Sequence, residues 1–75
     1  MMENKPLPCL MVDFNNCDKF GRVRLNCRGT LRDISTQSLE LIEGLKILMD
    51  CEGVMVVGTV TFSNEDKVWV AVPER

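Results

Sequence analysis

The sequence predicts a single small all-β domain, a five- to six-stranded barrel that spans residues 1–75. The chain has 75 residues, of which 45% are apolar and 27% charged, and this composition is typical of one globular domain with a small hydrophobic core. Short runs of alternating apolar and polar residues recur along it, separated by glycines or polar clusters. Short strands with glycine bends can close into a small barrel that hides its own edges.

The first half of the chain predicts two strands. An apolar run over residues 7–14 ends in a polar turn over residues 15–18, and Pro6 and Pro8 place this strand at a sheet edge. After Phe20, apolar side chains at odd positions alternate with polar side chains at the even positions 22–32, the pattern of a half-buried strand. Gly29 interrupts the apolar row and indicates a bulge or a sharp bend. The polar residues 33–38 then predict a turn.

The segment from residue 39 to residue 50 allows two interpretations. One is a short helix near residues 39–49, with one apolar face formed by Leu39, Ile42, Leu45 and Leu48. The other is a pair of strands, residues 39–41 and 45–49, around a turn at Glu43 and Gly44. Glycine in a helix interior costs about 1 kcal/mol relative to alanine and is natural in a turn, which favours the strands.

The end of the chain predicts a hairpin. Residues 51–53 form a turn, residues 54–62 an alternating strand, residues 63–66 a second turn and residues 67–72 the last strand, which Pro73 ends. The single tryptophan, Trp69, either fills the core at one end of the barrel or anchors a partner from the outer face.

The composition excludes several kinds of chemistry. The sequence has no histidine and no tyrosine, and the four cysteines, Cys9, Cys17, Cys27 and Cys51, show no Cys-x-x-Cys pairing. No glycine-rich phosphate loop is present, and Asp33 with Ser35 has no base partner. We therefore expect a protein that is not an enzyme, with no cofactor and no metal. Without an export signal or a long apolar stretch, we expect it to be cytoplasmic, with reduced cysteines and no membrane partner.

The charge distribution is the most unusual feature of the sequence. Residues 1–37 carry six basic and four acidic side chains, a net +2, whereas residues 38–75 carry three basic and seven acidic ones, a net −4. On the predicted strand, the even positions form a stripe of arginines at steps of about 6.5–7 Å, namely Arg22, Arg24, Arg28 and Arg32. Such a stripe is a solvated face, a dock for an acidic protein surface, or a site for phosphate or nucleic acid.

Three family resemblances involve the same residues. Residues 14–18, 21–27, 29–33 and 68–71 look like a family of short uncharacterised proteins of cyanobacteria, which implies a conserved cytosolic role. Residues 29–38, with 45–47 and 57–60, are similar to the PilZ barrel, whose Asp-x-Ser-x-x-Gly loop helps to bind cyclic di-GMP. Asp33 and Ser35 match that loop, Ser38 stands at its glycine, and Arg24 and Arg28 match the family's Arg-x-x-x-Arg element.

The third resemblance is to Sm-like RNA-binding barrels, which share the SH3-like architecture. It rests on Val23-x-Leu25, Gly29-x-Leu31-x-Asp33 and Gln37-x-Leu39, which resemble the first motif of that family. These resemblances imply an SH3-like or PilZ-like barrel. They also imply a nucleotide or RNA ligand, capped by Asp33 and Ser35 and contacted by the arginines.

Taken alone, the sequence favours a non-catalytic adaptor or regulatory protein that docks an acidic protein surface through the arginine stripe. The predicted binding residues are Arg22, Arg24, Arg28, Arg32, Asp33 and Ser35. Nucleotide or RNA binding is the alternative. An uncovered edge at the Pro6 and Pro8 strand makes a homodimer as reasonable as a monomer.

Overall fold

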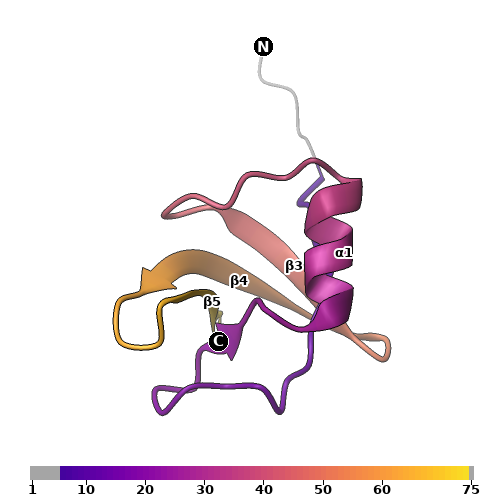
Figure 1. The fold of residues 1–75 in the computed structure, drawn as a ribbon. Helices are drawn as coiled ribbons and strands as arrows, with labels where there is room; N and C mark the ends of the chain where they lie inside the picture. The colour runs from indigo at the N-terminus through magenta and orange to yellow at the C-terminus, as the bar shows by residue number, and fades with distance from the viewer. Residues whose placement is uncertain (1–5, 75) are drawn as a thin grey trace.

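A curled, mixed β-sheet with one short helix makes up the structure, a computed structural model that describes residues 6–74 (Figure 1). The elements in chain order are β1 (Cys9–Met11), β2 (Val23–Arg24), α1 (Arg28–Thr36), β3 (Lys46–Cys51), β4 (Val54–Ser63) and β5 (Val68–Pro73). The strand order is β1-β3-β4-β5-β2, so β1 and β2 end the sheet and the architecture is a half-barrel. The predicted β class and the lower of the two predicted strand numbers are confirmed.

The strands β3, β4 and β5 form an antiparallel meander at the centre of the sheet. Cys51 pairs with Val54, so the turn between β3 and β4 has two residues. These are Glu52 and Gly53, with φ of 52° and 87°, and a turn with two positive φ angles has the twist that the flanking strands need. Ser63 pairs with Val68 across the next turn. The predicted final hairpin is therefore confirmed.

The edge position predicted for the first strand is also confirmed. β1 pairs in parallel with β3, Leu10 lying beside Met49, and no strand of residues 6–74 lies on its other side. The strand is short, because Pro8 precedes it and the chain turns at Phe14 and Asn15. A short strand next to a proline is a common way to finish a sheet edge.

The long strand predicted over residues 20–32 is wrong beyond its first part. Only Val23 and Arg24 pair with β5, Leu25 N donates to Trp69 O at 2.9 Å, and residues 28–36 then form α1. The helix lies beside β1, where Gly29 brings the helix backbone close to Met11. The alternating pattern predicted a strand because Arg28 and Arg32 lie on the same face in a strand. They also lie on the same face in a helix, where they are one turn apart.

The segment from residue 39 to residue 50 is partly as predicted. The strand over residues 45–49 is confirmed as β3, whereas the strand over 39–41 and the alternative helix near 39–49 are both wrong. Residues 37–45 form an irregular loop whose leucines, Leu39, Leu41 and Leu45, pack against the core without regular structure. Gly44 sits in the predicted turn with φ of 86°, and its N–H donates to Val60 O at 2.9 Å.

One face of the curled sheet forms the core. Cross-strand partners such as Val60 and Ala71 share that face, and the buried cluster consists of Leu10, Val12, Val23, Leu25, Ile47, Met49, Val60 and Ala71. Trp69 packs at one end of this cluster, edge-to-face with Phe62 at 5.2 Å between ring centroids. Of the two roles predicted for Trp69, the structure therefore shows the one in which it fills the core. Both halves of the chain contribute to the core, so they form a single packed unit.

Candidate binding surface

The structure divides the six predicted binding residues between two places. Arg22 and Arg24 lie at β2, whereas Arg28, Arg32, Asp33 and Ser35 lie on α1. The four arginines therefore do not form one stripe on one strand. Their side chains differ in what they contact, and this separates structural arginines from those that are available to a partner.

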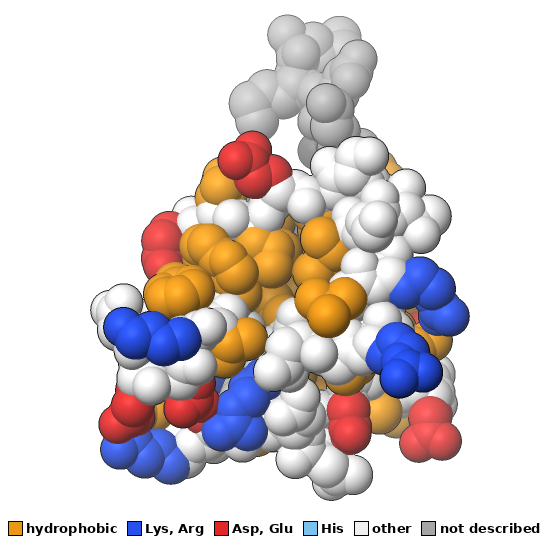
Figure 2. Space-filling view, in the orientation of Figure 1, with side chains coloured by type: hydrophobic (Ala, Val, Ile, Leu, Met, Phe, Trp, Pro, Cys, Tyr) orange, Lys and Arg blue, Asp and Glu red, His pale blue; other side chains and the backbone are white. Residues whose placement is uncertain are grey.

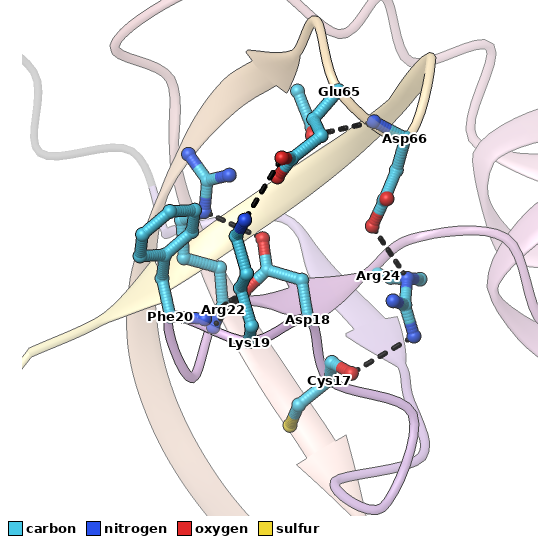
Figure 3. Close-up of polar contacts among 9 residues, drawn as sticks. Cys17, Asp18, Lys19, Phe20, Arg22, Arg24, Glu65 and Asp66 are labelled. Carbon is cyan, nitrogen blue, oxygen red and sulfur yellow. Dashed lines mark hydrogen bonds and ion pairs between the residues drawn. The ribbon is translucent and has the colours of Figure 1, made fainter.

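Arg22 belongs to a tight turn that Asp18 organises (Figure 3). One Asp18 carboxylate oxygen accepts the backbone N–H groups of Phe20 and Arg22, each at 2.9 Å, and the other accepts Arg22 Nε at 2.7 Å. The side chains of Asp18 and Arg22 are only 5% and 23% exposed. Arg22 therefore holds the entry to β2, and most of its side chain is covered by the fold.

Arg24 and Lys19 connect the basic half of the chain to the acidic turn between β4 and β5. Arg24 Nε contacts Asp66 at 3.0 Å, and its terminal nitrogen donates to Cys17 O at 2.8 Å (Figure 3). Lys19 contacts Glu65 at 2.9 Å. Part of the charge asymmetry seen in the sequence is therefore matched inside the molecule, where the two halves meet.

Hydrogen bonds lower the pKa of two carboxylates, Asp18 and Glu43. Burial by itself raises the pKa of Asp18, but the hydrogen bonds from Arg22 and Phe20 outweigh it, so the net pKa is lowered. The pKa of Glu43 is also lowered, because it accepts the N–H of Phe62 and the hydroxyl of Thr61, each at 2.7 Å. Each lowered pKa means that the folded state holds the charged carboxylate more tightly than the unfolded state does.

The expected result is an acid-sensitive fold. The contribution of Asp18 and Glu43 is complete above the ordinary values of 3.8 and 4.5 and is lost as the pH falls through the lowered folded-state values. Urea unfolding at a series of pH values should therefore show stability decreasing below about pH 5, less steeply in Asp18→Asn/Glu43→Gln. Glu40→Gln, an exposed surface change, is the control. Parallel pH profiles for the wild type and the double variant would contradict this assignment.

The remaining arginines lie on what we call the outer face of α1, formed by Arg28, Leu31, Arg32, Ser35 and Thr36, all of them exposed. Arg32 Nε is 4.0 Å from Asp33, and no carboxylate of the described residues lies that close to Arg28. Leu31, between the two arginines, is 53% exposed. The outer face therefore combines two cations with an apolar side chain that its own fold does not cover.

The surroundings of this face are also partly apolar. Figure 2 shows hydrophobic side chains gathered between α1 and the turn that joins β4 to β5, with Lys and Arg side chains on both sides. Leu31 was not among the predicted binding residues, because the alternating pattern places it in the buried row of a strand. The signal that could have revealed it is the Arg28-x-x-x-Arg32 spacing, which is one helical turn.

Asp33 and Ser35 do not form the loop that the PilZ resemblance implies. Both lie in α1, with Ser35 on the outer face and Asp33 on the opposite side, where it accepts the N–H of Met11 at 2.8 Å. The structure therefore places Arg28, Arg32 and Ser35 on one exposed face, whereas Asp33 turns toward β1 and keeps one contact with Arg32, at 4.0 Å from its Nε. Asp33 is already engaged by the protein backbone.

The structure also has a groove that was not predicted from the sequence. An open groove of about 310 Å³ has an almost entirely apolar lining, namely Phe14, Cys17, Gly21, Val23, Val54, Val56 and Pro73. Phe20, next to Gly21, is 65% exposed and has Lys19 Nζ and Arg22 Cζ at 5.3 and 5.0 Å from its ring centroid. The groove lies where residues 14–23 meet the beginning of β4 and the end of β5.

The cysteines are the remaining reactive side chains among the described residues. All four cysteines carry free thiols and are partly buried, and the pKa of Cys9 is raised by burial and by Asp50 and Asp33. Within residues 6–74, no three Cys, Asp or Glu side chains lie close enough to hold a metal ion. Over the same residues, no helix is long and apolar enough to cross a membrane.

Comparison of the chain with protein-family models, with curated proteins and with solved structures finds no match. Its function therefore has to be inferred from its own surfaces. The outer face of α1 carries two exposed arginines with no carboxylate closer than 4.0 Å among the described residues.

Proposed function

We propose that this chain is a non-catalytic adaptor or regulatory protein that docks an acidic protein surface through the outer face of α1. The observation that carries this proposal is the pair Arg28 and Arg32, one turn apart beside exposed Leu31. Within residues 6–74, neither arginine has a carboxylate closer than 4.0 Å. By contrast, Arg22, Arg24 and Lys46 each have a close carboxylate partner.

The chemistry of this face defines the partner. A guanidinium group binds a carboxylate through two parallel hydrogen bonds, and arginine is enriched at protein interfaces. Two such groups one helical turn apart, about 5–6 Å, fit two carboxylates that flank an apolar contact for Leu31. The charges steer the encounter and set its specificity, while burial of Leu31 adds apolar contact area.

This proposal narrows the surface that the sequence suggested. Arg22 and Arg24 hold β2 and its neighbouring turn, so their replacement would act on stability as well as on binding. Arg28, Arg32 and Ser35 are exposed, and among the described residues the one ion pair that their replacement removes is the 4.0 Å contact between Arg32 and Asp33. The proposed partner-binding residues of the predicted set are therefore Arg28, Arg32 and Ser35.

The experiment is a pull-down from the extract of the source cells with matched baits. Arg28→Glu/Arg32→Glu should weaken recovery of a protein partner by about ten-fold or more, since reversing two charges creates repulsion where there was attraction. Arg28→Lys/Arg32→Lys keeps the charge, and Lys67→Glu reverses a charge at an exposed position away from α1. Equal recovery with all four baits, wild type included, would contradict the proposal.

The alternative, a nucleotide or RNA ligand for a PilZ-like or Sm-like barrel, is separated by the same experiment. Half of each sample is treated with nuclease, and a partner that disappears with nuclease is nucleic acid or is held by it. Binding of nucleic acid should also weaken steeply with salt, by about one logarithmic unit per phosphate contact for each ten-fold rise in salt. Since Asp33 is engaged by Met11 N, we favour the protein partner.

A further inference from the structure

The free edge of β1 presents a defined set of backbone groups. Within β1, alternate residues face β3, because Leu48 N donates to Pro8 O at 2.8 Å and Val12 N donates to Asp50 O at 2.9 Å. The N–H and C=O groups of Cys9 and Met11 therefore point the other way, toward the side where the described part of the chain adds no further strand. An unpaired row of this kind is a template for another strand.

Thr30 and Asp33 of α1, together with Gln37 directly after the helix, occupy this template with their side chains. Thr30 Oγ1 donates to Met11 O, Asp33 Oδ2 accepts from Met11 N at 2.8 Å, and Gln37 Nε2 donates to Cys9 O at 2.8 Å. These residues follow one another along one side of the helix, opposite to its outer face. They supply a donor, an acceptor and a donor to the backbone of β1, which are the partners that a neighbouring strand would supply.

The helix that carries these side chains has little support of its own. Cys27 makes no side-chain hydrogen bond as N-cap, the first turn has no acidic residue, and Thr30 is the only buried residue of the helix. Arg28 stands at the first position, next to the positive end of the helix dipole, and Gly29 follows it. A nine-residue helix of this kind depends on its tertiary contacts, here those with β1.

The β1 strand itself has no other protection. Residues 7–12 carry no charged side chain, whereas exposed edge strands usually have a lysine or another charge that discourages pairing. Leu7 and Met11 are 39% and 46% exposed, so apolar area is available there for a second strand to cover. Pro8 faces β3 and leaves the outward groups of Cys9 and Met11 unaffected.

We propose that β1 is a latent strand-pairing surface, that Thr30, Asp33 and Gln37 close it, and that its occupant when α1 lifts is β1 of a second copy of this chain. Two copies of β1 running antiparallel about Leu10 pair Cys9 of each copy with Met11 of the other. This arrangement is two-fold symmetric and uses every outward N–H and C=O group of the two residues. It does not depend on the outer face of α1 or on the partner proposed for it.

The first test removes the three closing side chains. Sedimentation of Thr30→Val/Asp33→Ala/Gln37→Ala should show concentration-dependent dimers, whereas the wild type and the outer-face control Ser35→Ala/Thr36→Ala remain monomeric. Amide hydrogen exchange at Met11 should accelerate at least ten-fold in dilute triple variant, while Ile47 in the core reports that the sheet is intact. A triple variant that stays monomeric at every concentration would overturn the proposal.

The second test identifies the paired edge with peptides of residues 7–13 in which Cys9 is replaced by serine. The unmodified peptide should bind the triple variant and bind the wild type at least ten-fold more weakly. N-methylation at Met11 should abolish binding, because that N–H faces the protein, whereas N-methylation at Leu10 should preserve it. If the triple variant does not fold, Asp33→Ala alone should show the same selectivity between the two methylated peptides, and equal binding of both would refute the pairing.

Discussion

Replacing Ile47 by alanine is expected to lower the free energy of unfolding by about 3–4 kcal/mol, the range for a large buried aliphatic side chain whose removal leaves a cavity. Ile47 is 0% exposed and lies in β3, between β1 and β4. A domain of 75 residues has a total stability of about 4–11 kcal/mol. A single truncation at this position therefore removes a large part of what keeps the chain folded.

Chemical unfolding followed by tryptophan fluorescence measures this effect, since Trp69 packs against the same core. Ile47→Val should cost about 1 kcal/mol, because it removes one methylene and leaves a smaller cavity. Val72→Ala, at a side chain that is 42% exposed, should stay within about 0.5 kcal/mol of the wild type. A midpoint for Ile47→Ala equal to that of Val72→Ala would show that β3 does not pack as described.

Replacing Gly58 by valine is expected to cost about 2–3 kcal/mol, through overpacking and not through a cavity. Gly58 lies opposite Ile47 in the middle of β4. A Cβ atom there would stand 2.8 Å from Met49 Cε and 3.2 Å from Ala71 Cβ, closer than non-bonded carbon atoms normally approach. Strand propensity alone predicts the opposite sign, because valine is favoured in strands and glycine is not.

A double-mutant cycle separates these two effects. If the clash with Met49 is the cause, Gly58→Val combined with Met49→Ala should cost less than the sum of the two single changes, with a coupling of about 1 kcal/mol or more.

Gly29→Ala is the contrasting change. Its Cβ would meet the exposed, flexible side chain of Met11, which can move away, so stability should hold or rise slightly. Additive costs in the cycle would rule out the steric explanation.

The strands of the second half could be predicted because their signals are local. In β4 and β5, alternating residues lie between turns whose residues are unambiguous, such as Glu52 with Gly53, and neither strand depends on a distant segment to define its pattern. The edge position of β1 could also be predicted, because Pro8 limits where a strand can pair. These strands could therefore be predicted from patterns within short stretches of neighbouring residues.

The helix could not be predicted because its cause is not local. Residues 28–36 carry alternating side chains and lack a helix cap, so their own preferences do not favour α1. What holds them is the edge of β1, whose outward groups at Cys9 and Met11 bond to Thr30, Asp33 and Gln37. Nothing in residues 28–36 by themselves shows that this edge will lie beside them.

The candidate site was predictable in composition but not in arrangement. The four arginines look equivalent in the sequence, and what distinguishes Arg24 from Arg28 is Asp66, which lies 42 positions later in the chain. The acidic turn that pairs with Arg24 and Lys19 comes close to them only because β5 pairs with β2. Which charges remain available is therefore a property of the fold.

The strand order has a consequence for how the chain folds as it is synthesised. Both outer strands, β1 and β2, precede in the sequence the inner strands that they pair with, β3 and β5. The inner meander consists of two hairpins, whose contacts are close in sequence and form quickly. During synthesis, β1 and β2 therefore have no sheet partners until these later strands leave the ribosome. We expect stable folding only after β5 has left the ribosome, with the meander assembling first and the outer strands closing over it.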